Sequence, residues 1–209
     1  NQVDLYSTRF TDRALDQIAA LFTDDPPSWH RQHDKYSVHG LPIGRGLRAE
    51  VEPMSGVKGG KAVRIWWYYP RGDEAGDQAE RYFRLQIWRE LSLAWWMASF
   101  TCDIDGKEVY GAGEDSSDYY PGQKLSDGRV VVGIMDDVTE LDEFSLVSRG
   151  GQVGTTIEKA DASDVSVEGM IAAARARVSA RKDVPPPARS WWGGWAPEAR
   201  REPQKEISA

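Results

Sequence analysis

The stretch 62–100 constrains the fold more than any other part of the chain. It contains five of the nine tryptophans, in runs of aromatic, β-branched and arginine residues that are interrupted by the polar segment 70–78. Residues of this kind suit a pleated, half-buried surface. Phe83, Leu85 and Ile87 alternate with polar residues, which indicates a strand with one apolar face. The stretch therefore predicts antiparallel strands at the centre of the fold.

The expected fold class is α+β, with an aromatic-rich antiparallel sheet connected as a meander. The strands are expected at 47–54, 62–69, 81–89, 91–104, 129–135 and 144–148. A helix over 77–91 competes with the third strand, because Phe83, Ile87 and Leu91 are also spaced by four residues. The pair Asp105-Gly106 favours a hairpin, since it suits a tight turn.

Two helices are expected to pack on this sheet. The first spans 11–22, with Thr11 as N-cap and an apolar stripe at helical spacing. The second spans 164–182 and ends before three consecutive prolines. Residues 28–46 are rich in glycine and histidine and are expected to be irregular. The predicted organisation is one domain over 1–183 and a docking arm over 184–209.

Composition limits the classes of function. The formal net charge of −7 argues against nucleic acid as a partner. Cys102 is the single cysteine, which excludes an intrachain disulfide and favours a buried thiol. No apolar run approaches the ~20 residues of a spanning helix, so we expect a soluble protein of undefined compartment.

The charge is unevenly distributed along the chain. Residues 103–143 contain twelve acidic and three basic residues, a net charge of −9. Residues 175–209 contain eight basic and four acidic residues, a net charge of +4. These two regions are expected to attract each other or to face different partners.

The candidates for a metal or catalytic site are few. His30 and His33, with Asp34 or His39, provide ligand types that bind zinc, although a polar surface loop has the same composition. No nucleophile motif or phosphate-binding loop is present in the sequence. We expect no cofactor and no catalytic residue.

Aromatic residues and carboxylates suggest two further functions. Sugars stack on tryptophan, so a carbohydrate-binding module or glycan-active enzyme is the alternative interpretation of Trp66, Trp67, Trp95 and Trp96. A pair of acids such as Asp103 and Asp105 could serve such an enzyme only if two carboxyl groups faced each other across a cleft. Arginines among the aromatics would also suit single-stranded nucleic acid, which the acidic charge opposes.

The main interpretation is a non-enzymatic protein-interaction subunit, or a binding protein of the inhibitor or immunity type. Trp191, Trp192 and Trp195 follow a proline-rich spacer, and tryptophan is a frequent interface anchor. The expected partner-binding residues are these three tryptophans together with Asp136, Asp137 and Glu140. The arm is expected to dock either on its own domain or on a protein partner, including a second copy of the chain.

Overall fold

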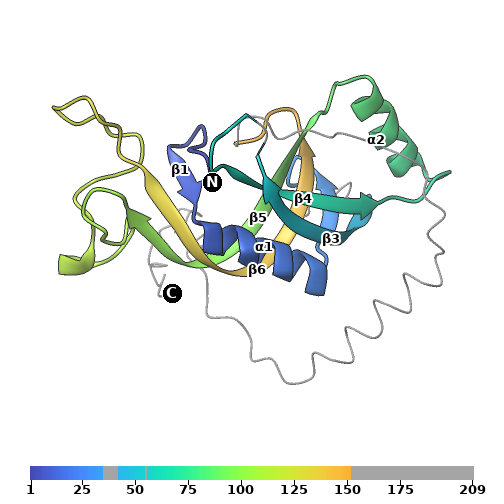
Figure 1. Cartoon of the computed structure of the whole chain (residues 1–209). Coiled ribbons are helices and arrows are strands. Elements are labelled where there is room, and N and C mark those ends of the chain that lie inside the picture. Colours follow the sequence, from blue (N-terminus) through green and yellow to red (C-terminus); the bar gives the residue numbers. More distant parts are fainter. Residues whose placement is uncertain (35–41, 55, 152–209) are drawn as a thin grey trace, which may run out of the picture.

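The computed structural model describes residues 1–34, 42–54 and 56–151, and these form an α+β fold (Figure 1). In chain order the elements are β1 (Thr8–Phe10), α1 (Asp12–Asp24), β2 (Ser28–Arg31), β3 (Gly44–Pro53), β4 (Lys61–Tyr68), α2 (Glu74–Arg84), β5 (Glu90–Cys102), the 3-10 turn η1 (Gly113–Asp115) and β6 (Gly133–Val147). The expected helix at 164–182 and the arm at 184–209 lie outside the described residues. The division into one domain and an arm therefore stays a prediction.

The sheet is mixed, so the expected antiparallel meander is wrong. β1 and β2 both run parallel to β6 and lie along successive parts of its length. β5 runs antiparallel to β6 on the opposite edge, and β2 continues through β3 to β4. β1 ends opposite Met135 and β2 begins opposite Glu143, so α1 carries the chain onward along β6 and both strands point in one direction.

The strand expected at 81–89 is wrong, because this segment begins inside α2. The Asp73 carboxylate caps the helix by accepting hydrogen bonds from the backbone N–H groups of Ala75 and Gly76, both at 3.2 Å. Ala79 and Phe83 lie four residues apart on its buried face. Leu85 and Ile87, the other members of the apparent alternation, are exposed beyond the helix end.

The acidic segment 136–143 is part of a strand and does not form a loop between the strands expected at 129–135 and 144–148. β6 is a single strand of 15 residues that includes the end of one expected strand and most of another. Val138 and Leu141 face the core within the acidic segment. The pairing with β5 shifts register twice near Trp95 and Trp96, and Asp137 has a positive φ of 54°. These irregularities interrupt the simple alternation of core-facing and solvent-facing side chains along a strand.

The other expected elements are mostly confirmed. α1 begins after Thr11, whose side-chain oxygen accepts the Ala14 N–H at 3.0 Å. The strands expected at 47–54, 62–69 and 91–104 correspond to β3, β4 and β5. Residues 28–46 are expected to be irregular, and this is wrong at β2, where Ser28–Arg31 form a strand. At Asp105-Gly106 the chain turns with a positive φ at Gly106, but its partner strand is reduced to a bridge between Thr101 and Glu108.

An aromatic cluster around Trp29 forms the main core. The Trp29 ring is completely buried and packs against four other rings: Trp67, Tyr69, Phe83 and Phe144. Ala14 and Ile18 of α1 bury against Val138 in a second cluster. α1 thus lies across β3, β4 and β6 (Figure 1). Neither helix of the described residues has the length and apolar composition needed to cross a membrane.

Candidate functional site

The most exposed acidic region lies where β5 and β6 extend beyond the rest of the sheet. We call residues 103–132 the acidic lobe; Figure 1 shows it projecting from one end of the molecule. It contains seven acidic and three basic residues, a net charge of −4. A small core of Cys102, Val109 and Val131 anchors it, and all three are buried. The expectation of a buried thiol is confirmed.

Two carboxylates of the acidic lobe hold its own backbone. Asp103 accepts the Val132 N–H at 2.8 Å. Asp105 accepts the Lys107 N–H at 3.1 Å and the Ser117 hydroxyl at 2.9 Å. These bonds give Asp103 and Asp105 a structural role in shaping the lobe.

Other side chains of the lobe face solvent. Glu114, Asp115 and Asp118 are exposed, and within the described part of the chain their carboxylates have no hydrogen bond or ion pair. Tyr110 and Tyr120 lie in the same lobe with 53% and 63% of their surface exposed. Tyrosine is enriched at protein interfaces because it combines a large apolar ring with a polar tip.

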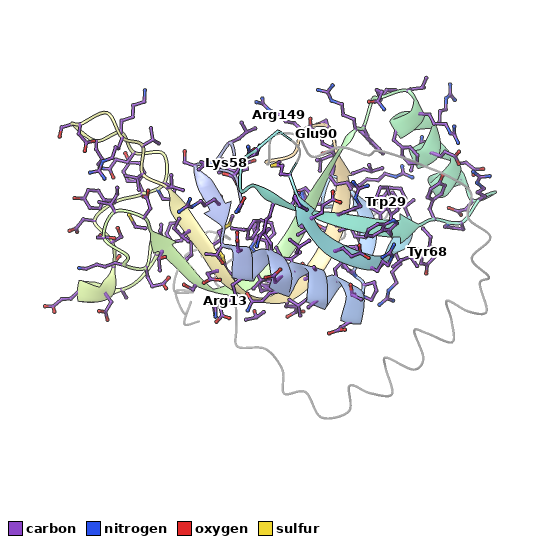
Figure 2. The ribbon with its side chains drawn as sticks, viewed as in Figure 1. Arg13, Trp29, Lys58, Tyr68, Glu90 and Arg149 are labelled. Carbon is purple, nitrogen blue, oxygen red and sulfur yellow. The ribbon has the colours of Figure 1, made fainter. Side chains whose placement is uncertain are left out.

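Asp136 and Asp137 contact α1. Asp136 accepts a hydrogen bond from the Thr11 hydroxyl at 2.7 Å and forms an ion pair with Arg13 at 3.0 Å. Arg13 is labelled in Figure 2. The Gln17 amide donates to Asp137 at 3.2 Å. Glu140 is half-buried and has no ion pair among the described residues. The first two carboxylates therefore attach α1 to β6, and the role of all three in partner binding stays a prediction.

The four tryptophans of the carbohydrate alternative lie in different environments. Trp67 packs on the main core, and Trp95 packs edge-on against Phe10 at 4.9 Å between ring centres. The Arg48 guanidinium covers the Trp66 ring at 3.8 Å from its centre. All four rings, including Trp96, are only partly exposed. Sugar binding by these four residues stays a prediction.

The structure places the two candidate histidines in separate contacts. The buried imidazole of His30 contacts the Ser28 hydroxyl at 2.8 Å. His33 contacts the carboxylate of Glu143 through Nδ1. The Ser145 hydroxyl donates to the other oxygen of Glu143 at 2.5 Å. No group of three metal-ligating side chains occurs among the described residues, so a shared metal site at His30 and His33 has no support there.

Glu143 is a residue that the sequence reasoning did not single out. Its side chain is 2% exposed, in the middle of the sheet, although the surrounding sequence is acidic and polar. A buried carboxylate is unfavourable unless it is paired and hydrogen-bonded, and His33 and Ser145 fulfil that need. A signal in the sequence was its position directly before the apolar residues Phe144, Leu146 and Val147.

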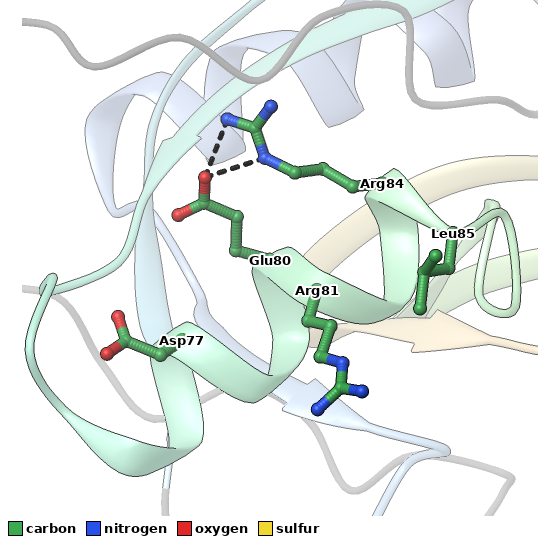
Figure 3. A pocket seen from close by; sticks show the side chains of 5 residues that line it. All are labelled: Asp77, Glu80, Arg81, Arg84 and Leu85. Atoms are coloured by element: carbon green, nitrogen blue, oxygen red, sulfur yellow. Dashed lines mark hydrogen bonds and ion pairs between the residues drawn. The ribbon is translucent and has the colours of Figure 1, made fainter.

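A shallow depression of about 430 Å³ lies on the surface of α2. Figure 3 shows Glu80 and Arg84 paired on one side of the helix and Arg81 extending from the other. Glu80 also accepts the Tyr69 hydroxyl, and that bond, followed by Arg84, lowers the pKa of Glu80. The depression is lined by the Glu80–Arg84 pair together with Asp77, Arg81 and Leu85, and its open shape suits a docking surface better than a small-molecule site.

Tyr69 gives a pH-dependent prediction. Burial, and then its bond to the Glu80 carboxylate, raises the pKa of Tyr69 from 10.0 to about 12. The folded protein retains this proton more strongly than the unfolded chain does, so the contribution of Tyr69 to stability is complete below about pH 10. We expect that contribution to be lost as the pH rises toward 12.

A phenolate absorbance titration of the wild type and Tyr69→Phe checks this expectation. The difference between the two curves isolates Tyr69 from the other tyrosines, and its midpoint should lie near pH 12. In urea unfolding, the difference in the free energy of unfolding between the wild type and Tyr69→Phe should become smaller between pH 10 and 12. A difference curve centred near pH 10 would contradict the assignment.

A second exposed surface follows the end of α2. Leu85 and Ile87 are 58% and 54% exposed. Arg81, four residues before Leu85, and Arg89, two residues after Ile87, are exposed too. We call these four residues the α2 end patch. Arg81 has no ion pair among the described residues, and Arg89 is 3.7 Å from Glu90. The patch is not predicted from the sequence, because the alternation at 83–87 places Leu85 and Ile87 on the apolar face of a strand.

The predicted anchors Trp191, Trp192 and Trp195 lie outside the described residues. Their role in partner binding stays a prediction from the sequence. No protein-family model, curated protein or solved structure matches this chain.

Proposed function

We propose that the protein is a non-enzymatic binding protein, either a subunit of a larger assembly or of the inhibitor or immunity type, and that the acidic lobe contacts its partner. The observation that carries the proposal is the exposure of Tyr110 and Tyr120 in the same lobe as three carboxylates that have no hydrogen bond or ion pair to the residues that the structure describes. Tyrosine rings provide contact area at a low cost in conformational entropy. Unpaired carboxylates provide charge for recognition.

The lobe favours a partner with a basic surface. Glu114, Asp115 and Asp118 lie within five residues of one another, so their fields add. A basic surface would be steered toward them, and the steering would weaken with added salt. Because Asp103 and Asp105 fix the lobe backbone, these groups are presented on an ordered scaffold, which lowers the entropic cost of binding.

The test is affinity purification from the native source with identification of partners by mass spectrometry. The double variant Glu114→Lys/Asp118→Lys should lose partners that the wild type retains at low salt. The matched control is Asp16→Lys/Asp24→Lys, which makes the same change in charge on exposed positions of α1. Partners retained equally by all three proteins would overturn the role of the lobe.

The arm is tested in the same experiment. A chain that lacks residues 186–209 should lose partners or form smaller complexes by light scattering, because the deletion removes Trp191, Trp192 and Trp195. Unchanged partners and unchanged complex size would contradict this part of the proposal. The lobe variant and the deletion then separate the two proposed contacts.

A further inference from the structure

The acidic lobe and the α2 end patch lie at opposite ends of the molecule. α2 precedes the first residue of β5, and the lobe follows its last residue. β5 has 13 residues, which corresponds to a length of about 40 Å. Figure 1 shows the same separation, with the lobe at one side of the view and α2 at the other.

The two surfaces are complementary in chemistry. The lobe carries a net charge of −4 with exposed tyrosine rings, and the α2 end patch has two exposed arginines beside two exposed aliphatic side chains. Arginine pairs with carboxylates and also stacks on aromatic rings. Leu85 and Ile87 are large apolar groups, so covering them with a tyrosine ring is favourable.

One copy cannot satisfy this complementarity within itself. β5 pairs with β6 along its length, so the sheet is a rigid spacer between the lobe and the patch. We propose that the acidic lobe of one copy binds the α2 end patch of a second copy, head to tail. The proposal rests on the proposed function and names a second copy of the chain as one partner of the lobe.

This contact joins two different surfaces, so it is heterologous. Each added copy leaves one free lobe and one free patch, and assembly therefore continues beyond the dimer unless a ring closes. The average mass should rise with concentration without a plateau at two copies. Because charge pairs contribute to the contact, association should be about tenfold weaker at 0.5 M salt than at 0.05 M salt.

The experiment is light scattering coupled to size exclusion on the full chain. Arg81→Glu/Arg89→Glu reverses the patch and leaves Arg84, which pairs with Glu80, in place. Glu114→Lys/Asp118→Lys reverses the lobe. Each variant alone should be monomeric, because every contact would join an altered surface to an intact one and the attraction between opposite charges would be lost. An equimolar mixture should associate again, since the intact lobe of the first variant can bind the intact patch of the second.

The matched control for the patch is Lys58→Glu/Arg149→Glu, which makes the same change in net charge at exposed positions outside both surfaces (Figure 2). This control should associate like the wild type. A wild type that stays monomeric at all concentrations, or mixed variants that stay monomeric, would overturn the inference. Loss of other partners in the lobe variant, together with a monomeric wild type, would leave the proposed function standing and reject self-association alone.

Discussion

Replacement of Trp29 by alanine is expected to cost about 3–5 kcal/mol of the free energy of unfolding. The indole ring is completely buried and packs against Trp67, Tyr69, Phe83 and Phe144. Alanine would leave a cavity between the sheet and α2 that these rings cannot fill without leaving their positions. A domain of this size has a total stability of roughly 5–15 kcal/mol, so the variant should approach unfolding at ambient temperature.

Urea unfolding followed by circular dichroism measures this effect. Trp29→Phe is the graded comparison, because a smaller ring keeps the stacked contact with Phe144 and removes an indole N–H that has no partner within the described residues. It should cost clearly less than alanine. The exposed Tyr120→Ala should change stability by less than about 0.5 kcal/mol. A loss below about 1 kcal/mol for Trp29→Ala would contradict the central role of this ring.

Glu143→Ala is expected to be the second most destabilising change, at about 2–3 kcal/mol. The substitution leaves a cavity and removes the acceptor of the Ser145 hydroxyl and the contact of His33 Nδ1. The Ser145 side chain is completely buried, so its hydroxyl cannot turn to water. Thermal and urea unfolding both report this loss.

The double variant Glu143→Leu/Ser145→Ala tests the mechanism of that loss. Replacing both buried side chains by apolar groups should recover part of the stability, because no hydroxyl is left without an acceptor. The recovery is partial because the His33 N–H loses its 3.1 Å bond to the Ser145 hydroxyl oxygen. Glu50→Ala, at an exposed position on β3, is the control and should be nearly neutral. If the double variant were no more stable than Glu143→Ala, the Ser145 hydroxyl left without its acceptor would not be the cause of the loss.

The elements that could be predicted from the sequence are those with strong local signals. Thr11 precedes an apolar stripe with helical spacing, and α1 forms with that residue as its cap. β3, β4 and β5 consist largely of aromatic, aliphatic and alternating charged residues, and these sit in the sheet as expected. In each case the local preference and the tertiary position agree.

The incorrect predictions share a physical cause, which is dependence on distant contacts. Segment 136–143 is acidic and is expected to be a loop, but β5 pairs with it on one side and Thr11, Arg13 and Gln17 neutralise or bind its carboxylates. β2 has only four residues after Pro27 and is held by β3 and β6. No local pattern reports these partners.

The exposed carboxylates of the candidate site could be predicted as a region and not as individual residues. The acidic composition of 103–143 predicts an interaction surface, and only the fold separates the internally bonded Asp136 and Asp137 from the exposed Glu114 and Asp118. The α2 end patch depended on the correct assignment of a helix. Phe83 and Ile87 are four residues apart, a spacing that fits both the helical period of about 3.6 residues and the strand period of two residues.

The central position of β6 has a consequence for how this chain folds during synthesis. Thr8 pairs with Gly133, and Trp29 pairs with Phe144, so contacts between residues more than 110 positions apart complete the sheet. Such non-local pairing slows folding. Until the ribosome has released β6, the nascent chain holds β1 and β2 without their main partner and Trp29 without Phe144. This chain should therefore benefit from chaperone binding to its first half.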